Sequence, residues 1–98
     1  MKQIWDAEEL SRHWSLNYEE LELIKTKPYK SHVAFCIQLK YYQYYGIFPE
    51  NKKELADIPL QYISEQLGFE NRNDKILSYY DWEDRTARRH RQEILVVI

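Results

Sequence analysis

The segment YKSHVAFCIQLKYYQYY, residues 29–45, decides the fold of this chain. Its apolar side chains recur at spacings of three and four residues, which is the repeat of an α-helix. They form two stripes, the first made by Val33, Cys36, Ile37, Tyr41 and Tyr44 and the second by Phe35, Leu39 and Tyr42. A helix that is apolar on two sides needs neighbours on both, so we predict a central helix that ends at Gly46.

A strand is the competing prediction for residues 41–48, because Tyr, Ile and Phe favour sheets. No other segment alternates apolar and polar residues as a partner strand would. We therefore set the strand aside and keep the central helix as far as Gly46.

Two short helices are predicted before the central one. In a capping box, the side chain of the N-cap residue and a carboxylate three residues later each accept a backbone N–H. Two residue pairs have this spacing, Asp6 with Glu9 and Asn17 with Glu20. They predict helices over residues 7–13 and about 18–26, and Pro28 cannot continue the second.

Four more elements are predicted after Gly46. In chain order they are a short helical turn within 51–56, a helix over 60–67 with Pro59 at its first position, a helix over 72–80, and a last helix from about 82 to Leu95. The predicted fold class is all-α: one compact domain over residues 1–98, a bundle of five to seven short helices.

Composition restricts the classes of function. The 98 residues include one cysteine, Cys36, which excludes an internal disulfide and lies where a packed core thiol is expected. No apolar run approaches the roughly 18 residues of a membrane span, so we expect a cytoplasmic protein that contacts no membrane. The net charge of −2 does not suggest a uniformly basic surface, but the first 24 residues hold six acids against two bases, which leaves the remainder positive.

Residues 60–80 have the layout of a helix-turn-helix. The small residue Ser64 stands four positions before Gly68, and a glycine permits the tight turn between two such helices. The second helix would then carry Arg72, Asn73 and Lys75 toward the major groove of DNA. The alternative is an ordinary packed helix pair, which is common in small helical proteins.

A second cationic group lies in the last predicted helix, where residues 85, 88, 89 and 92 share a face. Its members are Arg85, Arg88, Arg89 and Arg91. Four guanidinium groups within seven residues repel one another, and a polyanionic partner would offset that repulsion. The alternative is a solvated face that pairs with the acids just upstream, Asp81, Glu83 and Asp84.

A third group lies at the start of the central helix, where free backbone N–H groups favour a phosphate. It contains Lys25, Lys27, Lys30, Ser31 and His32. The alternative is a helix start that contacts water.

Catalytic and metal-binding patterns are absent from the sequence. The three histidines, His13, His32 and His90, fall in different predicted elements, and two glycines are too few for a phosphate-binding loop. We therefore expect no catalytic site, no metal and no cofactor in this chain.

The segment from Leu23 to Leu95 resembles the N-terminal region of the TnpA-type replicative transposases, the Tn-three family of bacterial transposons. The resemblance lies in the order and spacing of several motifs, LIK at 23–25, HVAFCIQLKY at 32–41, GIFP at 46–49, IP at 58–59, YISEQLG at 62–68, Tyr80, and RTARRHRQEI at 85–94.

This resemblance implies that a much longer parent protein recognises the terminal inverted repeats of a transposon through this helical region during DNA transposition. The catalytic, metal-binding acidic residues would lie far downstream, and the remainder of the transposase would be a partner of this domain. The apolar run at 95–98 carries no helix cap, so we expect the chain to continue.

Two other functions fit the sequence. One is a protein–protein module, in which a patch of Tyr41, Tyr42, Tyr44 and Tyr45 mediates assembly or a homodimer. The other is a free-standing helix-turn-helix regulator, which would act as a symmetric dimer.

Overall fold

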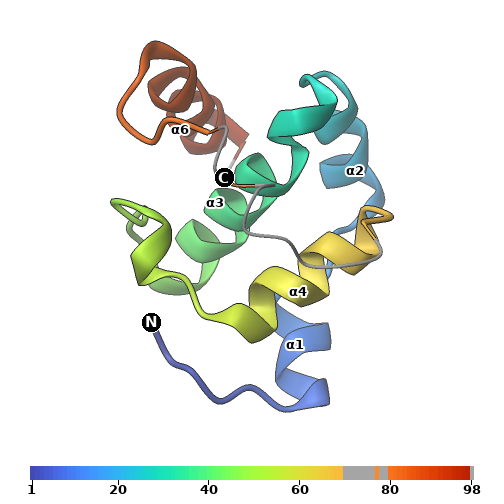
Figure 1. Ribbon diagram of the computed structural model, residues 1–98. Helices are drawn as coiled ribbons and strands as arrows, with labels where there is room; N and C mark the ends of the chain where they lie inside the picture. Colours follow the sequence, from blue (N-terminus) through green and yellow to red (C-terminus); the bar gives the residue numbers. More distant parts are fainter. Residues whose placement is uncertain (70–76, 78–79, 98) are drawn as a thin grey trace.

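The computed structural model describes residues 1–69, 77 and 80–97, and the regular structure within them is entirely helical. The elements in chain order, labelled as in Figure 1, are α1 (Ala7–His13), α2 (Tyr18–Lys25), the 3₁₀ turn η1 (Tyr29–Ser31), α3 (His32–Tyr45), the 3₁₀ turn η2 (Lys52–Glu54), α4 (Asp57–Gln66) and α6 (Arg85–Val97). The all-α prediction is confirmed for these residues.

Helix α3 is the centre of the fold, and α1, α2, α4 and α6 all pack against it (Figure 1). Every residue from Val33 to Tyr41 is buried, so neighbours cover all sides of its first two and a half turns. The two apolar stripes seen in the sequence therefore predicted its position correctly, and residues 41–45 are helical rather than extended.

The two capping boxes form as predicted. In α1 the Glu9 N–H donates to Asp6 Oδ1 at 2.8 Å, and the Asp6 N–H donates to Glu9 Oε1 at 3.1 Å. Asn17 and Glu20 repeat this exchange at the start of α2, with distances of 2.8 and 2.9 Å. Because such bonds are local, the sequence located α1 at 7–13 correctly and α2 to within one residue.

Three predicted helix starts are wrong, and one of them is that of the last helix, since α6 begins at Arg85 rather than near residue 82. Residues 29–31 form the turn η1, so α3 begins only at His32. Helix α4 begins at Asp57, which makes Pro59 its third residue rather than its first, and it ends at Gln66. Proline fits there because the N–H groups of a first helical turn have no partner within the helix.

Most of the helix predicted over 72–80 lies outside the described residues, and so do Arg72, Asn73 and Lys75. The helix-turn-helix prediction is thus tested only for its first helix, α4. Two residues of the later segment are described, and both Leu77 and Tyr80 are buried.

Gly46 ends α3 in the left-handed conformation, with φ of 75°, and its N–H donates to the Tyr42 carbonyl at 2.8 Å. A Cβ at this position would have open space around it, so the conformation alone makes other residues unfavourable. We expect Gly46→Ala to lower the free energy of unfolding by about 1 kcal/mol in urea denaturation. Gly46→Asn should cost less, because Asn tolerates this conformation better, and equal costs for both would contradict the explanation.

Candidate nucleic-acid interface

Three of the four arginines of α6 lie on the side of the helix that faces away from the core. Ala87, His90 and Ile94 are buried against the rest of the molecule, whereas Arg85, Arg88, Arg89 and Gln92 are exposed. With 3.6 residues per turn, the three exposed arginines fall within about 100° of arc. The prediction of a shared face is confirmed, and we call Arg85, Arg88 and Arg89 the arginine face.

The acids before α6 are engaged by the backbone. Asp84 Oδ1 accepts the Ala87 N–H at 2.9 Å and thereby caps α6, and Asp81 Oδ1 accepts the Glu83 N–H at 2.9 Å. Among the described residues, no ion pair joins the arginine face to a carboxylate. The alternative of a face neutralised by the upstream acids therefore finds no support in this part of the chain.

Arg91 has a different environment from the arginine face. It is half-buried, and its Nη1 donates to the Trp82 carbonyl at 3.1 Å. It also lines a surface pocket with Phe48, Pro49 and Glu50. Arg91 thus holds the segment before α6 against its first two turns, and it is less available to a ligand than the other three arginines.

The cationic group at the start of α3 does not gather into a phosphate site. Lys27 forms an ion pair with Glu93 of α6, and its ammonium lies 5.2 Å from the centre of the Phe35 ring. His32 is half-buried with Nε2 2.9 Å from the Lys27 carbonyl, and Lys25 pairs with Glu22. Lys30 is exposed, and it makes no ion pair with any described residue.

A buried polar chain lies beneath α6, and the sequence analysis missed it. Gln38 Nε2 donates to the Tyr80 hydroxyl at 2.8 Å, and that hydroxyl lies 2.8 Å from His90 Nδ1. The sequence signal was the position of His90, three residues after Ala87 and four before Ile94 on the buried stripe. Burial raises the pKa of Tyr80 to about 12. Burial lowers the pKa of His90 from its ordinary value, and the positive charge of Lys27 lowers it further.

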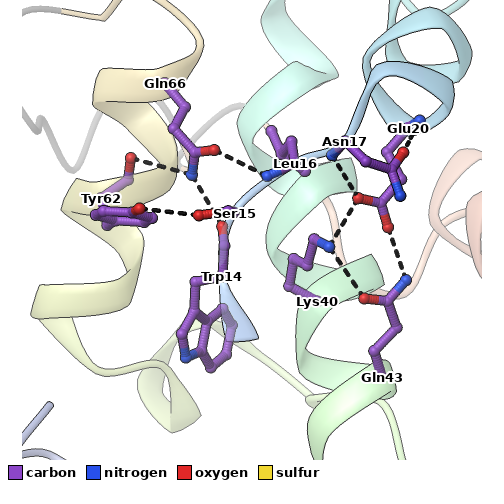
Figure 2. A network of polar contacts seen from close by, with 9 residues as sticks. All are labelled: Trp14, Ser15, Leu16, Asn17, Glu20, Lys40, Gln43, Tyr62 and Gln66. Carbon is purple, nitrogen blue, oxygen red and sulfur yellow. Dashed lines mark hydrogen bonds and ion pairs between the residues drawn. The ribbon is translucent and has the colours of Figure 1, made fainter. Parts of the chain in front are cut away.

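A second polar network, shown in Figure 2, fixes the link between α1 and α2. Gln66 of α4 donates to the Trp14 carbonyl and accepts the Leu16 N–H, each at 2.8 Å. On the other side of the link, the buried Lys40 ammonium lies 2.7 Å from the Glu20 carboxylate. Because these groups satisfy one another across three helices, we assign the network a structural role.

The described residues offer no reactive cysteine and no metal centre. Cys36 is fully buried in α3, and burial raises the pKa of its thiol well above its ordinary value. Nowhere in the described ranges do three His, Cys, Asp or Glu side chains come together as metal ligands would.

The tyrosines of α3 face the interior more than the surface. Tyr41 is buried and stacks near Tyr45, Tyr42 packs on Phe48, and Tyr44 contacts the Trp5 ring. Tyr44 alone of the four is exposed, so the exposed patch of four tyrosines that would favour the assembly alternative does not form.

None of the helices in the described residues is both long enough and apolar enough to cross a membrane.

No curated protein and no solved structure matches this chain. A family does match, over residues 1–98, and it is described as a domain of unknown function (DUF4158). Because the match covers the whole sequence, the chain belongs to this DUF4158 family.

Proposed function

We propose that this domain binds double-stranded DNA through the arginine face of α6. The observation that carries the proposal is that Arg85, Arg88 and Arg89 are exposed together on one helix, without a carboxylate partner among the described residues. Keeping three like charges so close is unfavourable unless a polyanion neutralises them. Guanidinium groups also bind phosphate oxygens in a two-pronged geometry, which suits the DNA backbone.

Phosphate contacts position a protein on DNA, and contacts to base edges provide specificity. We assign the first role to the arginine face, with the exposed Lys30 as an additional contact. The ion pair between Lys27 and Glu93 joins the segment that contains Lys27 to α6. The second role is proposed for Arg72, Asn73 and Lys75, which follow α4 in the sequence. Lys27, His32 and Arg91 are more engaged inside the protein, so we expect them to support the interface rather than to form it.

The biological target proposed here is the terminal inverted repeat of a transposon, bound by this domain as the N-terminal module of a replicative transposase. Support comes from the motifs between Leu23 and Leu95 that resemble such transposases. In this proposal the catalytic carboxylates belong to another part of the transposase, and this domain contributes recognition alone. Its partners are the DNA duplex and the remainder of the transposase.

The test compares two double variants with the same change of charge. Arg88→Ala/Arg89→Ala removes two cations of the arginine face, and Arg12→Ala/Lys25→Ala removes two exposed cations that pair with Glu8 and Glu22. Affinity for a fluorescent inverted-repeat duplex is measured by anisotropy at several salt concentrations. The first variant should bind more weakly, and the slope of log affinity against log salt should fall by roughly 0.9 per lost contact.

The control variant should keep most of the affinity and the slope. Equal effects of the two variants would exclude the arginine face as the DNA-contacting surface, because only total charge would then matter. A scrambled duplex of the same length separates recognition of the inverted repeat from non-specific binding.

A further inference from the structure

We infer that the buried hydrogen-bonded side chains of Gln38, Tyr80 and His90 hold α6 in the position that binds DNA. Protonation of His90 disturbs this arrangement, so the domain binds DNA less tightly in mildly acidic solution. This inference rests on the proposed function, since it concerns the same arginine face. It starts from geometry: three side chains from α3, the segment before α6 and α6 itself meet at two contacts of 2.8 Å each.

The hydrogen positions in this chain follow from its chemistry. The Ala34 carbonyl can only accept, and it lies 3.3 Å from the Gln38 amide group, so that group is the NH₂. The same NH₂ donates to the Tyr80 hydroxyl oxygen, which leaves the hydroxyl hydrogen to point at His90 Nδ1. His90 Nδ1 must therefore be an acceptor, and the proton of the neutral ring is on Nε2.

Protonation of His90 breaks this arrangement. Nδ1 becomes a donor, which the Tyr80 oxygen can accept beside the Gln38 NH₂, but the Tyr80 hydroxyl hydrogen then loses the acceptor that it had in Nδ1. His90 is 3% exposed, which leaves little water to compensate. The contact that joins α6 to the segment before it and to α3 would therefore be weakened, because it would leave a buried donor without a partner.

The charged neighbours of His90 do not relieve the cost. Lys27, before α3, and Arg89, on α6, oppose a positive ring, whereas Glu93 and Asp84 favour it. Both acids are already engaged, Glu93 by Lys27 and Asp84 by the Ala87 N–H. From α3 the Phe35 ring packs nearly perpendicular to the His90 ring, with ring centres 5.1 Å apart, and it offers no compensating charge.

The direction of the pH effect is diagnostic. Positive charge added at the surface would in general strengthen binding to a polyanion, whereas protonation of the buried His90 is expected to weaken it. Below the lowered pKa of His90, affinity should fall roughly tenfold per pH unit, because only the neutral form presents α6 correctly.

The experiment measures affinity for the inverted-repeat duplex between pH 5 and 8 at constant ionic strength, with circular dichroism to verify folding. His90→Asn keeps an oxygen that accepts the Tyr80 hydroxyl but does not titrate. It should bind like the unmodified protein at pH 7.5 and show no decline in acid. The matched variants His13→Asn and His32→Asn should retain the decline. Affinity that rises in acid, or a decline that persists in His90→Asn, would overturn the inference.

Nuclear magnetic resonance of the unmodified protein provides a test that needs neither DNA nor a variant. At neutral pH the His90 ring should show a hydrogen on Nε2 and none on Nδ1. When His90 titrates, backbone amides of α6 should shift with the same apparent pKa. If the protein bound no DNA at any pH, the proposed function alone would be refuted. If the chemical shifts of the α6 amides did not change as His90 titrates, the positioning role would be refuted.

Discussion

Phe35→Ala should lower the free energy of unfolding by about 3–5 kcal/mol, the usual cost of removing a fully buried aromatic ring. The Phe35 side chain has no solvent exposure, and its ring supports two contacts to α6. The His90 ring packs nearly perpendicular to it, and the Lys27 ammonium that pairs with Glu93 lies 5.2 Å from its centre. Since a domain of this size has about 5–15 kcal/mol of stability in total, the variant would be barely stable.

The measurement is urea denaturation followed by circular dichroism, with Phe35→Leu as the control. Leucine retains most of the volume, so that variant should lose about 1.5 kcal/mol or less. In Phe35→Ala the underside of α6 is also unsupported, so any remaining folded protein should bind DNA more weakly than Phe35→Leu. Similar costs for alanine and leucine would show that the ring is not the support for α6 that we describe.

Lys40→Met should lower the free energy of unfolding by about 3 kcal/mol, because it leaves a partly buried carboxylate without its cation. The Lys40 and Glu20 side chains are only 8% and 12% exposed, and their charged atoms are 2.7 Å apart. Glu20 also accepts the Asn17 N–H and a hydrogen bond from Gln43, so it cannot turn toward water without breaking the start of α2 (Figure 2).

A double variant tests the cause. Lys40→Met/Glu20→Gln should cost less than the sum of the two single changes, since no unpaired charge is left inside. Additive costs would mean that the two side chains act independently.

Acid should reveal the same ion pair. Burial alone would raise the pKa of Glu20, but the hydrogen bonds from Lys40 and the Asn17 N–H outweigh it and hold that pKa below the ordinary 4.5. A lowered pKa gives stability that is complete above 4.5 and is lost as the pH falls through the folded-state value. The unmodified protein should therefore lose more stability in this range than Lys40→Met.

The local features of this domain could be predicted from neighbouring residues. The capping boxes of α1 and α2 join residues three apart, so the sequence contains both partners of each bond. The face of α6 was predictable because residues 85, 88 and 89 have helical spacing, and the two apolar stripes of residues 29–45 placed α3 in the centre.

What the sequence by itself determined is thus the fold class, the capped starts of α1 and α2 and the shared face of the arginines of α6, because spacing along a helix sets direction. Only the tertiary structure decided which cations are available to a ligand. It pairs Lys27 with Glu93, which is 66 residues away in the sequence. It also brings together Gln38, Tyr80 and His90, although Gln38 lies 52 residues and Tyr80 lies 10 residues before His90. Such pairings depend on how helices pack around α3, and residue spacing along one segment carries no information about a partner on another.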